Sequence, residues 1–417
     1  MNVKDVSKEK QNYKLHLIKT NKFKTLFFKL SFRENLKEED IVLRNLLFQY
    51  LLYSTNKYKT EKDMTIKKQD LYGAYLNSNI VRYGNIIVSN ISLDILDPKY
   101  TESNMLEESI MFLKEVIFNP NVKNNSFDDN ILKIIKERSI NDILLIKNYP
   151  NTYGMIKLLD TMNITPISYD LRGKIEEIKR VSGKSLYEYY KKFLKKCFID
   201  ISLVGNIDTK KASDLFDKYF IFDTKPEELK EVNLNIYRNK KILVKEENTN
   251  NNQTNFFIGC TIKDLTDLER EYIATIYSII LGASPTSKLF MNVRERNSLV
   301  YAISSNFKRS DGLLCIKAGI SYKNYDKALK AIKKVLKEMT NNITDLELSS
   351  SKNLYISALE DTYEYPSDIA LYFYQTAYLG ARNINESIKI IKNITKEDIY
   401  KFAKKVYIDT IYVLKEK

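Results

Sequence analysis

The chain carries the same succession of predicted elements in both halves. Each half begins with two strands, continues with a long apolar helix and then forms a hairpin, as judged from hydrophobic periodicity and turn residues. These elements are expected at residues 13–18, 25–32, 38–53 and 75–94 in the first half, and at 242–245, 255–261, 267–281 and 294–320 in the second. The repetition predicts two domains of related fold, and 417 residues is a natural length for two cores of about 200 residues each.

The order of these elements also predicts the fold class. Strands that follow one another closely pair antiparallel, and the helices between them cover the sheets. We therefore predict an α+β fold in which each domain has a mainly antiparallel sheet with helices packed on one face. From composition we predict an N-terminal domain over residues 1–222, a polar linker containing Pro226 over 223–240, and a C-terminal domain over 241–417.

The formal charge of +14, from 67 Lys and Arg against 53 Asp and Glu, raises the question of nucleic-acid binding. Basic and acidic residues alternate in the amphipathic segments, for example over residues 174–180 and 327–338. The sequence has no zinc-finger spacing, no Gly-rich phosphate loop and no basic arm. A low-GC bacterial genome, rich in codons for Lys, Asn, Ile and Tyr, explains the excess charge equally well. We therefore predict no nucleic-acid binding.

Three features bear on the cellular compartment. No apolar run approaches the roughly 18 residues of a transmembrane helix, so no membrane span is predicted. The first residues lack the central apolar stretch of a secretion signal. Cys197, Cys260 and Cys315 are odd in number and widely separated in apolar segments, which is typical of buried free thiols. Together these features predict a cytoplasmic protein.

Arg294 and Tyr301 form the pattern with the clearest chemical meaning. They lie seven residues apart across a predicted helix-to-strand junction. A guanidinium donates to carbonyl or carboxylate oxygens, and a phenol does the same while its ring offers a face to a side chain. The pair can therefore grip a peptide backbone. An Arg near a helix end and a Tyr in a strand are also common structural residues, so spacing alone leaves both interpretations open.

Several motifs resemble one family of peptidases. The second half contains Leu281-Gly282-Ala283, Ser287-x-Leu289-Phe290, Arg294-Glu295 and Leu299-Val300-Tyr301, and the first half closes with Leu203-Val204-Gly205-Asn206. This set resembles the insulinase/pitrilysin-type peptidases over nearly the whole chain. The stretches Lys22-Phe23-Lys24-Thr25, Leu71-Tyr72-Gly73-Ala74 and Ile117-Phe118-Asn119-Pro120 look closest to the family's YmfF-type subunits, which lack catalytic zinc ligands.

The resemblance implies where a zinc site would lie. Active members of the family carry an inverted zinc motif, His-x-x-Glu-His, on the first long helix, together with a distal Glu. In this chain the two histidine positions are Asn45 and Gln49, and the glutamate position is Phe48. A catalytic zinc needs about three imidazole or carboxylate ligands and a nearby base. Since His16, the single histidine, lies in a predicted strand, we predict no catalytic residue, no zinc and no other cofactor.

Other catalytic chemistry lacks support in the sequence. Glu107, Glu108 and Glu115 fall at helical spacing and Asp128 precedes Asp129, but solvated helix faces explain these acids more simply than a site for a hard cation. A serine or cysteine protease needs a histidine base beside its nucleophile. One histidine, in a different context from all three cysteines, does not supply that pair.

In the family, the positions of Arg294 and Tyr301 hold a substrate-gripping pair, in two-domain subunits that face each other across a closed chamber. One subunit of such a pair can hold the zinc while the other holds the gripping residues. The resemblance thus predicts a non-catalytic subunit of a heterodimeric zinc peptidase, which orients a peptide for a zinc-bearing partner and has no peptidase activity alone. A scaffold subunit similar to the family's structural core subunits, without any peptidase role, is the alternative, and a homodimer also stays open.

Overall fold

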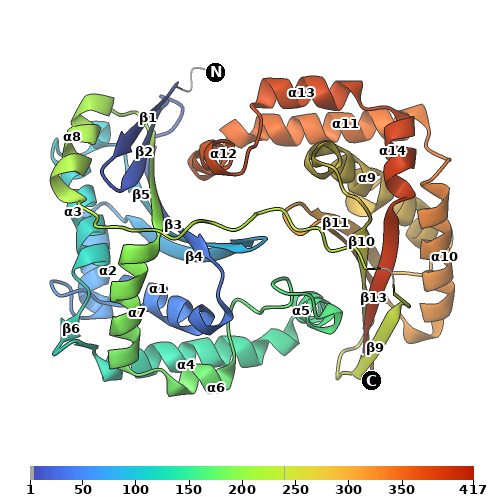
Figure 1. Ribbon diagram of the computed structural model, residues 1–417, viewed down its shortest axis with the longest axis horizontal. Helices are drawn as coiled ribbons and strands as arrows, with labels where there is room; N and C mark the ends of the chain where they lie inside the picture. The colour runs from blue at the N-terminus through green and yellow to red at the C-terminus, as the bar shows by residue number, and fades with distance from the viewer. Residues whose placement is uncertain (1–3, 239) are drawn as a thin grey trace. The chain divides into compact units, whose positions relative to one another are not determined.

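The computed structural model describes residues 4–238 and 240–417, which form two compact units, each built around one sheet (Figure 1). Both units are discontinuous in sequence. Unit 1 consists of the residues up to Ile143, Leu171–Lys230 and Thr362–Gly380, and unit 2 of Leu144–Asp170, Glu231–Asp361 and Ala381–Lys417. Residues 1–3 of the predicted N-terminal domain and residue 239 of the predicted linker lie outside the described residues. The predicted domain boundaries at residues 222 and 241 refer to the sequence repeat and remain a prediction.

The sheet of unit 1 has six strands in the order β1-β2-β8-β3-β5-β4. They are β1 (Lys4–Lys10), β2 (Tyr13–Lys19), β3 (Thr25–Asn35), β4 (Tyr75–Tyr83), β5 (Ile86–Leu96) and β8 (Phe198–Gly205), and a separate ribbon consists of β6 (Val122–Lys123) and β7 (Ser126–Phe127). Neighbouring strands are antiparallel except β2 and β8, which are parallel. The predicted hairpin around Tyr83-Gly84 is confirmed as β4 and β5.

One face of this sheet carries the main core of unit 1. The helices along this part of the chain are α1 (Ile41–Tyr53), α2 (Glu61–Asp70), α3 (Met105–Phe118), α4 (Asp129–Leu145), α6 (Ile175–Arg180), α7 (Gly183–Lys196) and α8 (Thr209–Tyr219). In β3 the residues Leu26, Phe28, Leu30 and Phe32 alternate toward this face and join the core formed with α1, α3, α7 and α8.

The sheet of unit 2 has five strands in the order β11-β12-β10-β13-β9, and only β9 and β13 are parallel. The strands are β9 (Leu243–Asn248), β10 (Thr254–Ile262), β11 (Ala302–Lys308), β12 (Leu313–Ile320) and β13 (Val406–Lys415). The helices are α5 (Pro150–Met162), α9 (Ala274–Ser278), α10 (Tyr325–Glu338), α11 (Asp345–Glu360), α13 (Ile384–Asn393) and α14 (Lys396–Ala403), with π-helical turns η4 (Glu269–Ile273), η5 (Ile279–Ala283) and η6 (Phe290–Glu295). The predicted α+β class, with two mainly antiparallel sheets and helices packed on them, is confirmed.

Each sheet also has an apolar patch on its second face, and one helix covers it. In unit 1 this helix is α12 (Pro366–Tyr378), whose Ile369 and Ala370 pack with Ile18, Phe27 and Val204 of the sheet. In unit 2 it is α5, whose residues 153–162 pack against β10, β12 and β13. Because α12 comes from the second half of the sequence and α5 from the first, each unit contains a helix that the repeat pattern places in the other half.

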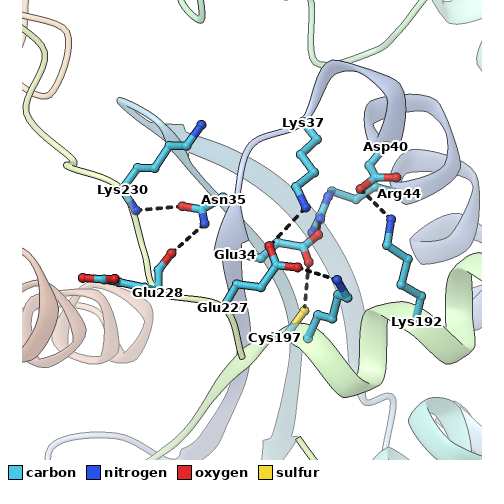
Figure 2. Close-up of polar contacts among 11 residues, drawn as sticks. Glu34, Asn35, Lys37, Asp40, Arg44, Lys192, Cys197, Glu227, Glu228 and Lys230 are labelled. Atoms are coloured by element: carbon cyan, nitrogen blue, oxygen red, sulfur yellow. Dashed lines mark hydrogen bonds and ion pairs between the residues drawn. The ribbon is translucent and has the colours of Figure 1, made fainter. Parts of the chain in front are cut away.

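The first part of the predicted linker is bound to unit 1 (Figure 2). The side chain of Asn35, at the end of β3, donates to the carbonyl oxygen of Glu228 and accepts from the backbone N–H of Lys230, both at 2.8 Å. Glu227 forms ion pairs with Lys37, at 3.1 Å, and with Lys196. Residues 227–230 therefore follow the surface of unit 1 as an ordered segment.

The second part of the linker is bound to unit 2. The backbone N–H of Leu234 donates to Ser310 O at 2.8 Å, and the buried guanidinium of Arg270 donates back to Leu234 O at the same distance. Arg238 forms two hydrogen bonds to the buried carboxylate of Asp409, at 2.8 and 3.2 Å. The linker is thus bound to the two units by hydrogen bonds and ion pairs along its length.

Close packing between α5 and β10 gives a test of this architecture. Gly154 of α5 faces Phe257 of β10, and a methyl group at position 154 would overlap the buried Phe257 ring. We expect Gly154→Ala to lower the free energy of unfolding, because overpacking costs about 1–3 kcal/mol and outweighs a helix-propensity gain of at most about 1 kcal/mol. Urea unfolding followed by circular dichroism measures the change.

Gly259→Ala is the matched control on the strand side. A Cβ there would lie 2.7 Å from the Sδ of Met162, a flexible side chain that can move away, so a smaller loss of stability is expected. If Gly154→Ala were as stable as the unsubstituted protein, α5 would not pack on β10 in solution.

Candidate functional site

Arg294 lies in η6, on the solvent side of a short π-helical segment of unit 2. Leu289 and Val293 are fully buried and fix this segment to the core. The Arg294 side chain is 42% exposed, and its guanidinium stacks on the Phe290 ring at 4.6 Å. Its Nε lies 3.7 Å from the carboxylate of Glu295, too far for a hydrogen bond, so its donors remain accessible to a ligand.

Tyr301 directly precedes the edge strand β11 of the same unit. Its backbone N–H donates to Gly319 O at 2.8 Å, which fixes the main chain at the start of the strand, while 62% of the residue is exposed. The phenol therefore projects from a rigid backbone into solvent.

The junction between the two residues is a tight helix end. Ser298 has a left-handed φ of 49°, its N–H donates to Arg294 O at 2.9 Å, and the N–H of Leu299 donates to Val293 O at 3.1 Å. Arg294 follows the buried Val293, and Tyr301 follows the buried Val300. The predicted helix-to-strand junction is confirmed, and the structure places both predicted residues on it as exposed side chains.

The three positions aligned with the zinc motif lie on α1, where Phe48 belongs to the core of unit 1 and Asn45 and Gln49 are half-buried. Phe48 is 1% exposed, and its ring meets those of Phe32 and Phe193 edge-on, with centroids 5.9 and 5.4 Å away. Asn45 donates to the carbonyl oxygen of Leu171. Gln49 donates to Ser139 Oγ at 3.0 Å and accepts from it at 3.3 Å. These side chains hold the fold together and offer no imidazole or carboxylate to a cation.

A buried ion pair stands directly beside the motif positions (Figure 2). Arg44 is 1% exposed, pairs with Glu34 and donates to Ser89 Oγ at 2.9 Å. The thiol of Cys197 lies 3.7 Å from the second oxygen of Glu34. Burial raises the pKa of Cys197 to about 12, so this thiol stays protonated at neutral pH. The polar groups near the motif are thus partnered within the protein.

The remaining candidate ligands are also engaged. His16, on β2, is buried and its Nδ1 lies 2.9 Å from Ser7 Oγ. Glu107 bonds to Lys218 and Tyr219, Glu108 pairs with Lys67, and Asp128 accepts from the first N–H groups of α4. Within residues 4–238 and 240–417, no group of three or more His, Cys, Asp or Glu residues is arranged to hold a metal ion.

The family profile described as "Peptidase M16 inactive domain" matches residues 180–355, a range that contains both Arg294 and Tyr301. The probable inactive metalloprotease YmfF of Bacillus subtilis (strain 168) is 26% identical over 410 residues, which cover 96% of this chain and 95% of that protein. The chain is an insulinase/pitrilysin-family (M16) peptidase homologue. Both the matching profile and YmfF are described as inactive, so the chain is a homologue of non-catalytic members of this family.

Two solved structures support the M16 fold over the full chain. A conserved protein from Enterococcus faecalis V583 superposes with a TM-score of 0.89 at 24% identity, covering 100% of this chain and 99% of that one. A peptidase M16 inactive domain from Pseudomonas fluorescens superposes with a TM-score of 0.79 at 16% identity, with the same coverage. Among the helices of the described residues, none is long and apolar enough to cross a membrane.

Sequence reasoning missed a second group of buried charged residues in this M16 homologue. Arg33 and Asp200 lie on the second face of the unit 1 sheet, and both are almost fully buried. A signal was present for Asp200, which is a charged residue inside an otherwise apolar strand, whereas Arg33 is followed by the polar Glu34 and Asn35. Without the register of β3 and β8, nothing in the sequence brings the two together.

Substitutions of Phe48 test whether this zinc-motif position is packed in the core. We expect Phe48→Glu to lower the free energy of unfolding by about 3–5 kcal/mol, because it removes a buried ring and buries a carboxylate without a partner. Phe48→Leu, the control, keeps an apolar side chain and should cost less in the same urea titration. Equal stability of the two variants would show that position 48 is not in the core and would reopen the mapping of the zinc motif.

The cysteines give a test that depends on pKa. Burial raises the pKa of Cys315 to about 11 and that of Cys260 further, as it does for Cys197. The thiolate is the reactive form and exists only near and above the pKa, so at pH 8 no more than about one native thiol in a thousand is ionised. We expect Ellman's reagent to find no fast-reacting thiol in the native protein at pH 8, and three in guanidinium chloride, since all three cysteines are free. One fast-reacting native thiol would contradict this burial.

Proposed function

We propose that this chain is a non-catalytic subunit of a heterodimeric insulinase-family zinc peptidase. Arg294 and Tyr301 bind the peptide, and a zinc-bearing partner subunit supplies the metal, the water and the general base. The observation that carries the proposal is the exposed Arg294 and Tyr301 pair on a hydrogen-bonded junction, in a chain whose zinc-motif positions hold Asn45, Phe48 and Gln49.

The chemistry assigned to the pair is positioning. The Arg294 guanidinium donates to a carbonyl oxygen or a carboxylate of the peptide, and the Tyr301 hydroxyl donates to a neighbouring oxygen while its ring contacts a side chain. A peptide held in this way presents its scissile bond to the partner's metal at a fixed place. Correct placement alone accounts for several kcal/mol of barrier lowering, so a subunit without metal can control turnover.

A cytoplasmic location belongs to the same proposal. Three free, buried thiols fit a reducing compartment, where structural disulfides are rare. Fractionation of host cells with an antibody to the chain tests this location.

The central experiment co-expresses the chain with a zinc-bearing relative from the same genome and measures kcat/KM on a fluorogenic peptide library. We expect Arg294→Ala combined with Tyr301→Phe to lower kcat/KM at least about tenfold, because each lost hydrogen bond to the substrate is worth about 1–3 kcal/mol. The zinc content of the complex should stay unchanged, since the partner holds the metal.

Two controls come from the chain itself. Arg296→Ala removes the next arginine along the segment, and Tyr149→Phe removes the hydroxyl of another tyrosine that is 62% exposed. Neither should change kcat/KM by more than about twofold. If the double variant at 294 and 301 behaved like these controls, the gripping role would be wrong. A chain that formed no active complex with any zinc-bearing relative would favour the scaffold function.

A further inference from the structure

A pocket of about 330 Å³ opens at the unit 1 sheet, and its wall includes charged residues of the second face as well as Tyr13 and Ile199 of the main core. Its wall includes Arg33 on β3, Phe198 and Asp200 on β8, Tyr378 at the end of α12, and Pro226 on the linker segment. All these residues belong to unit 1. The pocket is distinct from the Arg294 and Tyr301 pair, and its interpretation does not depend on a peptidase role.

Two opposite charges in this wall are buried and incompletely partnered. Arg33 is 7% exposed and Asp200 is 2% exposed. Arg33 Nη2 lies 3.6 Å from Asp200 Oδ2, which is longer than a hydrogen bond. Arg33 Nε and Asp200 Oδ2 have no hydrogen-bond partner among the described residues. A buried polar atom without a partner costs about 1–3 kcal/mol, more when charged, so both atoms gain from a ligand that bonds to them.

The aromatic ring above Arg33 fixes the direction of its donors. The guanidinium carbon of Arg33 lies 3.7 Å from the centroid of the Tyr378 ring, which holds the guanidinium plane and keeps the N–H donors at the edge of that plane. Burial, then the charge of Asp200 and a hydrogen bond to its carboxylate, raises the pKa of Tyr378, so this hydroxyl stays protonated at neutral pH and donates to Asp200. One edge of donors therefore lies next to one acceptor oxygen.

The charges at the rim are already paired, which limits the capacity of the site to one anion and one cation. Lys10 pairs with Asp217 at 2.6 Å, and Lys14 pairs with Glu9 at 3.0 Å. What remains is the positive edge of Arg33 and the negative oxygen of Asp200, side by side. Such a wall complements a neutral molecule that carries an anionic and a cationic group on neighbouring atoms.

We propose that this pocket binds a free α-amino acid as its zwitterion, with the carboxylate on Arg33 and the ammonium on Asp200. The two charged groups of an α-amino acid share one carbon, so both reach the adjacent partners at once. In a peptide the two termini are at least one residue apart, and only one of them can occupy the site. The volume lies at the small end of ligand pockets, which suits a single amino acid, and the Phe198 ring offers an apolar wall for its side chain.

The test uses the unsubstituted full-length protein and each of the 20 common amino acids. His16 is the single histidine of the chain, and its Nε2 lies 3.9 Å from Asp200 Oδ1, so its ring resonances give one unambiguous NMR probe beside the site. We expect at least one amino acid to shift the His16 signal in a saturable way, with a matching dissociation constant from calorimetry. If no amino acid moved this signal at about 10 mM, a concentration that detects even millimolar binding, the proposal would be wrong.

Blocked forms of the same amino acid separate the two contacts. The N-acetyl derivative lacks the ammonium and the amide derivative lacks the carboxylate, and each should bind at least tenfold more weakly than the free amino acid. If both blocked forms bound as well as the zwitterion, recognition would not use the pair of Arg33 and Asp200, and the proposal would fail. This arm needs no variant and therefore does not depend on the folding of one.

Asp200→Asn then tests the acceptor directly, because it keeps the shape of the side chain and removes its charge. We expect at least a tenfold loss of affinity, with the native circular dichroism spectrum retained. Asp217→Asn is the control, since this carboxylate pairs with Lys10 at the rim and is half exposed. Equal affinity of the two variants would overturn the assignment of Asp200. If Asp200→Asn does not fold, the blocked amino acids on the unsubstituted protein decide the question.

Discussion

Both sheets of this protein have apolar residues on both faces, and burying the second face is the constraint on which the rest of the architecture depends. A sheet with helices on one face only would leave Ile18, Phe27 and Val204 of unit 1 in water. In each unit this face is covered by a crossing helix, that is, a helix from the other half of the sequence. These helices are α12 for the first sheet and α5 for the second. Glycine at position 154 allows the close approach that one of these contacts requires.

The α+β class and the helix-to-strand junction at Arg294 could be predicted because each depends on local patterns. Period-two alternation shows in β3, and in both halves strands are followed by a helical segment and then by a hairpin, β4–β5 or β11–β12. The crossing helices could not be predicted in this way. An amphipathic helix shows that it has an apolar face but not which sheet that face meets, so the sequence reads as two successive domains whereas the compact units exchange segments.

The candidate site could also be predicted only in part from the sequence. The absence of zinc ligands could be read from residue types alone, because Asn45, Phe48 and Gln49 cannot replace imidazole and carboxylate. What these residues do instead is visible only in the structure, where Phe48 fills an aromatic cluster and Gln49 bonds to a helix 90 residues away. Beside them, Arg44 and Glu34 form a buried ion pair. At these positions the side chains contribute to packing and hydrogen bonding within unit 1.

The exchange of segments has a mechanical consequence. The chain passes between the two compact units at residues 143–144, 170–171, 230–231, 361–362 and 380–381. A protease that cuts once between residues 144 and 380, for example within the linker, therefore leaves each product with pieces of both units. The product that ends at residue 230 still contributes α5 to the second sheet, and the remainder still contributes α12 to the first. Such a nicked molecule stays associated through two separate helix contacts, each of which keeps the other at high effective concentration.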